Sequence, residues 1–165
     1  MATISTGALA GTASVVDGDT IVVAGQAIEL HGIDAPEYEQ NCHVGLEVWL
    51  CGLKATRALE SFIGASPVTC QDDGVCFVRG RDLAAWMVLN GWALATTDYE
   101  DQERRARIAE LGIWRGDFMT PWEWRRVSAW RHRRHCPPDA SSRATSPSPA
   151  STSFTCLAGA TMRTR

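Results

Sequence analysis

The chain has 165 residues, of which 45% are hydrophobic and 21% charged, and its formal net charge is −3. This length allows one folded domain with tails, and no apolar run approaches the roughly 20 residues that a membrane-spanning helix needs. The start, MATISTGALAGTAS, has neither a basic n-region nor an apolar h-region, so no signal peptide is visible.

The charge is distributed unevenly along the chain. Residues 1–103 contain four Lys and Arg against fifteen Asp and Glu, whereas residues 104–134 contain nine arginines against three acids. A basic segment beside an acidic domain is compatible with a polyanionic partner. Charge alone rather favours a solvated arginine-rich helix face.

Three strands are predicted in the first third of the chain, at residues 13–16, 20–24 and 27–33. The Asp-Gly-Asp sequence at 17–19 is predicted as a turn. Gly25 and Gln26 are predicted as a two-residue type II′ connector, which favours glycine first. Pro36 ends the third strand, because proline cannot continue the hydrogen-bonded ladder.

A helix is predicted at residues 45–63 from an approximate leucine stripe. Residues 67–70 and 75–78 then form a hairpin across the sequence QDDG. A second helix follows at 82–91, with Asp82 as N-cap and Gly91 at its C-terminus.

A third helix is predicted to open with the capping box Thr97–Glu100 and to stop at Gly112. Ile108 and Leu111 are its expected anchors. Trp114, Trp122 and Trp124 are expected to pack as core and edge plugs, with base stacking as the alternative.

The predicted domain covers residues 12–126. Residues 1–11 and 127–165 are predicted to be disordered, since Ser, Thr, Pro, Ala and Arg dominate the long tail and offer no core. The composition of the tail is also typical of an out-of-frame translation of GC-rich DNA, which makes a frameshifted C-terminus a hypothesis.

The order of elements predicts an α+β fold built mainly on β-structure. Three strands, a helix, two strands and two further helices pack naturally as a five-stranded, partly open barrel with about three helices against it. This is the pattern of an OB-fold.

Six cysteines fall at positions 42, 51, 70, 76, 136 and 156. Local spacing favours the pairs Cys42–Cys51 and Cys70–Cys76, with buried free thiols as the alternative. Disulfides would imply an oxidising compartment. Zinc is disfavoured because no C-x-x-C pair exists, and the cluster His132, His135 and Cys136 lies in a segment without an evident core.

Asp19 and Asp34 are candidates for a metal site. A hairpin between them brings the ends of its strands to one rim, where two carboxylates suit a hard cation such as Ca²⁺. Glu37 lies three residues past Asp34 and could polarise a water molecule. Turn-capping aspartates are the alternative reading of the Asp-Gly-Asp sequence.

The sequences VVDGDTIVV, IELHGIDAPE and GIWRGDFMTPWEWRR, in this order, resemble the staphylococcal nuclease (thermonuclease) family from about Thr12 to Arg126. The resemblance implies an OB-fold and Ca²⁺-dependent cleavage of DNA and RNA. By position it implies that Asp19, Asp34 and the backbone carbonyl of Ala35 are metal ligands. Glu37 would be the general base.

Two departures from the family pattern concern arginines. Five residues before Asp34, where the family has an arginine, this chain has Glu29, and the turn that carries the family's second arginine is absent between the strands joined by QDDG. Arginine forks stabilise the charge that develops on a phosphate during cleavage. We therefore expect low catalytic competence, with Arg79 and Arg81 as candidate replacements for the phosphate contacts.

The sequence thus predicts an impaired, thermonuclease-like phosphodiesterase that takes Ca²⁺ and single-stranded or double-stranded DNA or RNA. The alternatives are a non-catalytic OB-fold module that binds single-stranded nucleic acid, and a degraded remnant. We expect a monomer that does not engage membranes. The cysteines favour a secreted or periplasmic location, although no signal peptide is visible.

Overall fold

The structure of the protein is a computed structural model that describes residues 8–135, and the side chains of residues 8–130. The chain divides into two compact units, residues 1–125 and residues 126–165. The division falls inside the last helix. All elements up to that helix belong to the first unit, which also carries the candidate site.

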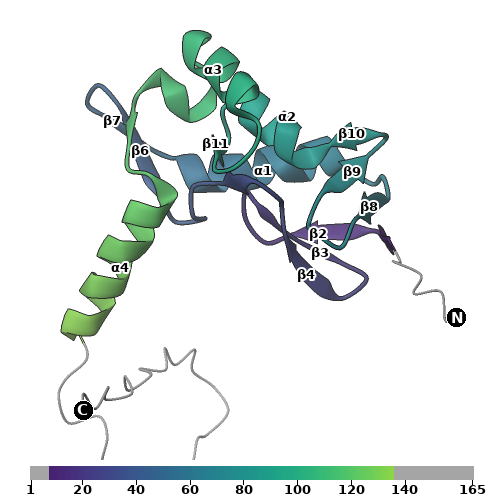
Figure 1. Cartoon of the computed structure of the whole chain (residues 1–165). Helices are drawn as coiled ribbons and strands as arrows, with labels where there is room; N and C mark the ends of the chain where they lie inside the picture. Colours follow the sequence, from purple (N-terminus) through teal and green to yellow (C-terminus); the bar gives the residue numbers. More distant parts are fainter. Residues whose placement is uncertain (1–7, 136–165) are drawn as a thin grey trace, which may run out of the picture. The chain divides into compact units, whose positions relative to one another are not determined.

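Short strands and four α-helices alternate along the described residues (Figure 1). The first strands are β1 (Leu9–Gly11), β2 (Ala13–Val15), β3 (Thr20–Val23), β4 (Gln26–Glu29), β5 (Ile33–Asp34), β6 (Asn41–Val44) and β7 (Glu47–Leu50). The later strands are β8 (Val68–Cys70), β9 (Cys76–Val78), β10 (Arg81–Asp82), β11 (Leu94–Ala95) and β12 (Asp117–Phe118). The helices are α1 (Cys51–Ile63), α2 (Leu83–Leu89), α3 (Glu100–Ile108), the 3₁₀ helix η1 (Gly112–Arg115) and α4 (Pro121–His135).

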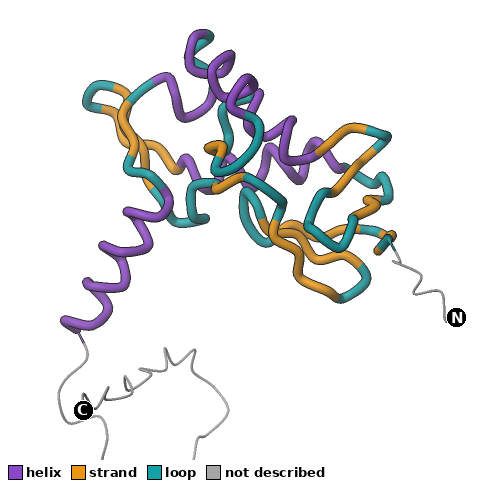
Figure 2. The backbone as a smooth tube through the Cα atoms, viewed as in Figure 1, coloured by secondary structure: helices purple, strands orange, loops and turns teal. Residues whose placement is uncertain are grey.

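The protein has an α+β fold in which the strands pair in four antiparallel sheets (Figure 2). Their strand orders are β1-β8-β9-β10, β2-β3-β4, β11-β5 and β12-β6-β7. Among the described residues these sheets remain separate and do not close into one barrel. The α+β prediction is therefore confirmed in its coarse form.

The first hairpin differs from the prediction in its turn. Val23 pairs with Gln26, so the two turn residues are Ala24 and Gly25 rather than Gly25 and Gln26. Both have positive φ, 49° and 81°, which is the signature of a type I′ turn. The predicted type II′ connector is wrong by one residue, because Ala24 adopts a left-handed conformation that alanine does not favour.

The helix predicted at residues 45–63 begins six residues later. Residues 41–50 form the β6–β7 hairpin, and α1 starts only at Cys51. The first two leucines of the stripe are not buried, since Leu46 is fully exposed and Leu50 is 48% exposed. Gly45 lies in the turn with a positive φ of 59°. The hairpin register, reinforced by a Cys42–Cys51 disulfide, overrides the local helical pattern.

The second half of the domain confirms one predicted helix start and contradicts another. Asp82 caps α2, where its carboxylate accepts a hydrogen bond from the amide of Ala85. The predicted capping box at Thr97–Glu100 does not form, because α3 begins after Tyr99, which has a positive φ of 71°. The Tyr99 hydroxyl instead donates to Asp82.

The helix α3 also packs differently from the prediction. Ile108 is 79% exposed and Leu111 is 41% exposed, so neither anchors the helix. Ala106 is its buried residue, and α3 ends at Ile108 rather than at Gly112. Arg107 instead places its guanidinium over the ring of Trp114.

The ordered region is longer than predicted at both ends. Residues 9–11, expected to be disordered, form β1 and pair with β8. Residues 127–135, also expected to be disordered, continue α4. The remaining predictions for 1–7 and 136–165, including the proposed frameshifted tail and Cys136, lie outside the described residues.

Two clusters of buried side chains form the interior. The larger packs β3, β8 and β9 against α1 and α2, with Ile21, Leu59 and Met87 at its centre. The smaller surrounds Cys42, Cys51 and Ile113, with Trp114 packed against it. The predicted packing role is thus confirmed for Trp114, whereas Trp122 is 43% exposed.

None of the helices in the described residues is long and apolar enough to cross a membrane.

Candidate functional site

The candidate site begins at the turn Asp17-Gly18-Asp19, between β2 and β3. Asp17 holds the turn, because its Oδ1 accepts hydrogen bonds from the amides of Asp19 at 3.2 Å and Thr20 at 2.8 Å. A Cβ on Gly18 would lie 2.6 Å from the Cβ of Ala35, so only glycine lets the turn pack against the next loop. The first aspartate therefore shapes the turn and leaves the second available to the site.

Asp19 is partly buried and holds the turn to the segment after β5. Its Oδ2 accepts a hydrogen bond of 2.6 Å from the amide of Ala35. Burial raises the pKa of Asp19 to about 7, the charges of Asp17 and Asp34 act in the same direction, and the Ala35 amide opposes them. Asp19 therefore sits where negative charge is already in excess.

Asp34 and Glu37 line the same pocket. Asp34 ends β5, where it pairs with Leu94 of β11, and Pro36 then carries the chain to Glu37. The Asp34 side chain is 12% exposed and that of Glu37 33% exposed. The pairing of β5 with β11 and the turn at Pro36 together place both carboxylates at the opening of the pocket.

Arg125, from the first turns of α4, joins these two carboxylates. Its Nη1 donates to Asp34 Oδ1 at 2.9 Å and to Glu37 Oε1 at 2.7 Å, and its Nη2 donates to Asp34 Oδ2 at 2.8 Å. These bonds to Asp34 and Glu37 raise the pKa of Arg125 above its usual range. A guanidinium thus forks onto one carboxylate and bridges to the second.

A pocket of about 460 Å³ connects these groups. Its lining consists of Asp17, Asp19, Thr20, Glu29, Leu30, Ile33, Asp34, Glu37, Thr96 and Arg125. Five of these side chains are carboxylates and one is a guanidinium. The structure therefore brings Asp19, Asp34 and Glu37 together, and places Glu29 beside them.

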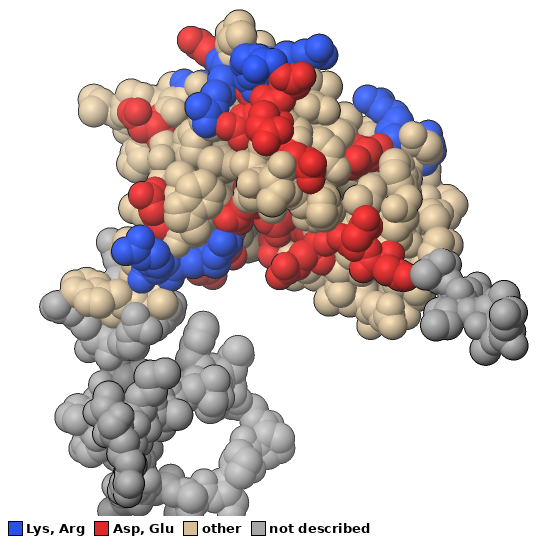
Figure 3. Space-filling model, in the orientation of Figure 1, with Lys and Arg blue, Asp and Glu red and all other residues tan. Residues whose placement is uncertain are grey.

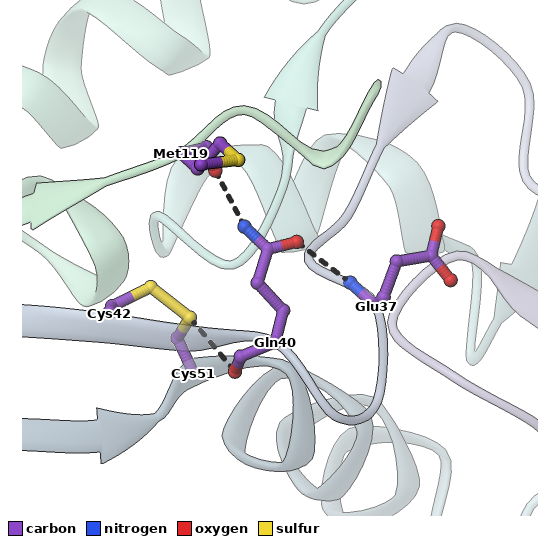
Figure 4. Close-up of a disulfide and its surroundings, with 5 residues drawn as sticks. All are labelled: Glu37, Gln40, Cys42, Cys51 and Met119. Carbon is purple, nitrogen blue, oxygen red and sulfur yellow. Dashed lines mark hydrogen bonds between the residues drawn. A yellow bond between two sulfur atoms is a disulfide. The ribbon is translucent and has the colours of Figure 1, made fainter. Parts of the chain in front are cut away.

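Gln40 connects the Glu37 loop to the segment that leads into α4. Its side chain is fully buried, with Oε1 accepting from the Glu37 amide at 3.2 Å and Nε2 donating to the Met119 carbonyl at 2.5 Å. Figure 4 shows these two bonds, with the Glu37 carboxylate pointing away from Gln40. One amide thus fixes both the loop that carries Glu37 and the approach to Arg125.

The Cys42–Cys51 disulfide lies next to the backbone of Gln40. The Cys51 Sγ is 3.4 Å from the backbone carbonyl oxygen of Gln40 (Figure 4). Gly52, the next residue, approaches so closely that a Cβ there would lie 1.6 Å from the Glu37 carbonyl oxygen. The start of α1 is therefore packed against the backbone of the site.

Both predicted disulfides are confirmed. Cys42 and Cys51 have Cα atoms 5.6 Å apart, and Cys70 and Cys76 join the strands on either side of the QDDG turn. The described residues contain no free cysteine.

Arg79 and Arg81 do not reach the pocket. The Arg79 guanidinium donates to the carbonyls of Phe62 and Ile63 at the end of α1, and both arginines lie over the Phe62 ring. Neither arginine lines the pocket, and their role in phosphate contacts stays a prediction. Arg79 uses its hydrogen bonds to hold the C-terminus of α1.

The arginine that does reach the pocket is Arg125, which the sequence interpretation missed. The available signal was the tetrapeptide Thr120-Pro121-Trp122-Glu123 before it. Glu123 Oε2 accepts from the Thr120 amide at 3.2 Å, which is the glutamate half of a capping box, and from the Thr120 hydroxyl at 2.6 Å, with proline at the first helical position. This pattern indicates a helix start, but nothing local indicates that Arg125 meets Asp34.

No group of three or more His, Cys, Asp or Glu side chains within the described residues is arranged to hold a metal ion. The donor chemistry nevertheless suits a hard cation, because the oxygens of five carboxylates line the pocket. In the present arrangement Arg125 supplies the nearest positive charge. Ala35 contributes its amide to Asp19, and the role of its carbonyl stays a prediction.

No protein-family model matches the chain. The chain is similar to the succinoglycan biosynthesis protein ExoI of Rhizobium meliloti strain 1021, with 36% identity over 123 residues. The similarity covers 64% of this chain and 64% of that relative.

Proposed function

We propose that the chain is a thermonuclease-like, Ca²⁺-dependent phosphodiesterase that acts on DNA or RNA with low activity. The observation that carries this proposal is the pocket shared by Asp19, Asp34 and Glu37. These residues come from three places in the sequence, and each occupies the position that the resemblance to the staphylococcal nuclease family assigns to a metal ligand or to the general base.

The same proposal includes an OB-like barrel. The β2-β3-β4 meander leads directly into β5, and the amide of His31 donates to the Gly74 carbonyl, so β4 approaches the β8–β9 turn. The strand β1 pairs with β8 on the other side. These links support a partly open barrel whose sheets are joined by single hydrogen bonds.

Asp19 and Asp34, with the carbonyl of Ala35, are the residues that would hold Ca²⁺. When bound, the cation would neutralise phosphate charge and polarise the scissile bond. Asp19 must be ionised to act as a ligand, and its raised pKa makes that ionisation costly without a cation. We therefore propose that Asp19 loses its proton as the cation arrives.

Glu37 would take a proton from the attacking water. Its carboxylate is one third exposed and lies at the mouth of the pocket, while its backbone is fixed by Gln40. A base held in this way can meet a water molecule with little reorganisation. For this role Glu37 must exchange its hydrogen bond with Arg125 for one with water.

Low activity follows from the charges around the pocket. Glu29 lines it where a phosphate-binding arginine is expected, and an arginine in phosphoryl transfer is worth roughly 10³–10⁵ in rate. Figure 3 shows Asp and Glu side chains in a band across this face of the first unit. A polyanionic substrate is repelled by such a surface unless cations are present.

The test is cleavage of a fluorogenic single-stranded oligonucleotide with Ca²⁺ or with a chelator. We expect slow, Ca²⁺-dependent cleavage that Asp34→Asn and Glu37→Gln abolish, with Glu60→Gln on the exposed face of α1 as a control that leaves the rate unchanged. Cleavage that persists in the chelator or in both site variants would contradict the proposal.

The second candidate is an OB-fold module that binds single-stranded nucleic acid without cleaving it. Glu29 favours it, because a carboxylate in place of a phosphate-binding arginine acts against catalysis while leaving the fold intact. Retention of the oligonucleotide without any product over a long incubation distinguishes binding from catalysis. Neither product nor retention would point to a remnant without either function.

A role in succinoglycan biosynthesis is a further candidate, favoured by the name of the ExoI protein that the chain resembles. Expression of the chain in a Rhizobium meliloti strain that lacks ExoI tests this role. We expect restored succinoglycan yield only if the similarity extends to function, and an unchanged yield would set this candidate aside.

The two disulfides support a secreted or periplasmic location, since such bonds persist in oxidising compartments. Thiol titration of denatured, unreduced protein isolated from its own compartment tests this. Thiol from Cys42, Cys51, Cys70 or Cys76 in that preparation would contradict it. We also propose a monomer, for which sedimentation equilibrium is the measurement.

A further inference from the structure

The pocket contains one positively charged side chain, and it comes from an unexpected element. Of the ten lining residues, all within the described part of the chain, Arg125 alone is Lys or Arg. It belongs to α4, and 91 residues separate it from Asp34. The positions that would carry arginine according to the family pattern hold Glu29 and a shortened turn. The positive charge in this pocket therefore comes from α4 and not from the two positions of the family pattern.

The bonds of Arg125 leave part of its guanidinium available. Three N–H···O bonds connect it to Asp34 and Glu37, and a guanidinium has five N–H groups. The side chain is also 49% exposed. A phosphate oxygen can therefore approach the N–H groups that do not contact Asp34 or Glu37. The planar guanidinium matches the geometry of a phosphate.

The same bonds place Arg125 in competition with a cation. Asp34 gives both of its oxygens to the fork, so a cation that takes an Asp34 oxygen must displace at least one of these bonds. The released N–H groups would then face the pocket. Arg125 would thus lose a carboxylate partner and gain a phosphate partner in the same exchange.

We infer that Arg125 replaces the missing phosphate-binding arginine and exchanges its carboxylate partners for a substrate phosphate when a cation occupies Asp34. This inference rests on the proposed function and adds a specific residue to it. Without a cation, the guanidinium neutralises Asp34 and Glu37. With one, it contacts the phosphodiester and is a catalytic residue.

The exchange predicts opposite changes in two affinities. Calorimetry measures Ca²⁺ binding alone, and then binding of a nucleoside 3′,5′-bisphosphate at saturating Ca²⁺. In Arg125→Gln we expect Ca²⁺ to bind about three- to tenfold more tightly, because a partly exposed competitor is gone. We expect the bisphosphate to bind about ten- to a hundredfold more weakly, because charge-assisted hydrogen bonds are lost.

Two further variants control this experiment. Arg125→Lys keeps the charge without the fork, so Ca²⁺ affinity should stay within about threefold of the unmodified protein while the bisphosphate still binds more weakly. Arg126→Gln makes the same change at the next position of α4 and should alter each affinity by less than about twofold. Thermal unfolding of every variant establishes that each is folded under the conditions used.

An arginine with only a structural role would give another pattern. If Arg125→Gln weakens Ca²⁺ binding, or leaves bisphosphate binding unchanged, the inference is overturned. Cleavage assays distinguish failure of this inference about Arg125 from failure of the proposed function. Equal cleavage by the unmodified protein and Arg125→Gln would refute the inference alone, whereas opposite affinity changes without cleavage by any variant would refute only the nuclease activity.

Discussion

The segment from Glu29 to Glu37 and the first turns of α4 face the same pocket with opposite charge. The first is local in sequence, and its acids lie where a hairpin and a proline turn put them. The second arrives from the other end of the domain and places Arg125 against two of those acids. The comparison indicates that a positive charge lost from one element can be supplied by another, provided that the fold brings the two together.

The largest expected effect comes from restoring the charge at position 29. Glu29 is exposed on β4 and lines the pocket, so Glu29→Arg should fold normally and place a second guanidinium near the phosphate. We expect Ca²⁺-dependent cleavage to rise by about 10²–10³, which is at or below the lower end of the roughly 10³–10⁵ that an arginine contributes to phosphoryl transfer. Initial rates on a single-stranded oligonucleotide measure this gain.

Glu47→Arg is the matched control for this substitution. It makes the same charge change at an exposed position of β7, away from the pocket, and should alter the rate by less than about threefold. Equal gains in both variants would mean that overall charge limits the reaction rather than the pocket.

A change at Gln40 should remove the hydrogen bonds that connect the Glu37 loop to the segment before α4. Gln40→Leu keeps most of the side-chain volume but leaves the Glu37 amide and the Met119 carbonyl without their partner. We expect a loss of about 2–3 kcal/mol in the free energy of unfolding, because buried polar groups become unsatisfied. Urea denaturation measures it, and Gln26→Leu on exposed β4 should cost less than about 0.5 kcal/mol.

The pH dependence tests the acidic side of the comparison. The folded-state pKa of Asp19 is about 7 against an ordinary 3.8, so the folded protein binds this proton more tightly than the unfolded chain does. Its contribution to the free energy of unfolding is therefore greatest below about pH 4, declines as pH rises towards 7 and is lost above that. Chemical denaturation in a chelator should show Asp19→Asn to be more stable than the unmodified protein at pH 8, by about 1–3 kcal/mol.

Calcium should reverse the order of these two proteins at pH 8. It should stabilise the unmodified protein and have less effect on Asp19→Asn, because one carboxylate ligand is gone. At pH 4.5 the difference between the two proteins should nearly vanish. A variant that is equally destabilised at both pH values would show that Asp19 is mainly a structural acceptor for the Ala35 amide.

The smallest effect concerns the start of α4. Thr120→Ala removes the hydroxyl that donates to Glu123 and should cost about 1 kcal/mol, as measured by thermal unfolding. Thr97→Ala in the similar tetrapeptide Thr97–Glu100 should cost less, since Thr97 bonds only to its neighbour Asp98 in an exposed loop. Equal losses would mean that the two tetrapeptides are equivalent in spite of their different geometry.

These two tetrapeptides also show the limits of local interpretation. Both have the Thr-x-x-Glu pattern of a capping box, yet only in the one with proline at its second position does the glutamate accept from the threonine amide. At the other, Glu103 accepts from the Ala95 amide and Tyr99 donates to Asp82, so α3 begins from a left-handed residue held by long-range contacts. Tertiary hydrogen bonds outweighed the local pattern.

The side chains of the β6–β7 hairpin also show a local pattern that did not predict the structure. Leu46 and Leu50 fit a helical stripe in the sequence but are exposed in the structure. The Cys42–Cys51 pairing was predicted correctly, and a bond across ten residues that include Gly45 favours a hairpin over a continuous helix. The cysteine spacing was therefore a better guide to residues 42–51 than the helical stripe.

The sequence by itself determined the β2-β3-β4 meander, the capped start of α2, both disulfides and the candidate acids, because each depends on turns, alternation or spacing within a few residues. Only the tertiary structure decided which cation meets those acids. Arg125 reaches Asp34 through packing of Gln40, Met119 and the start of α4, and contacts between segments so far apart in sequence leave no periodic or local pattern from which they can be predicted.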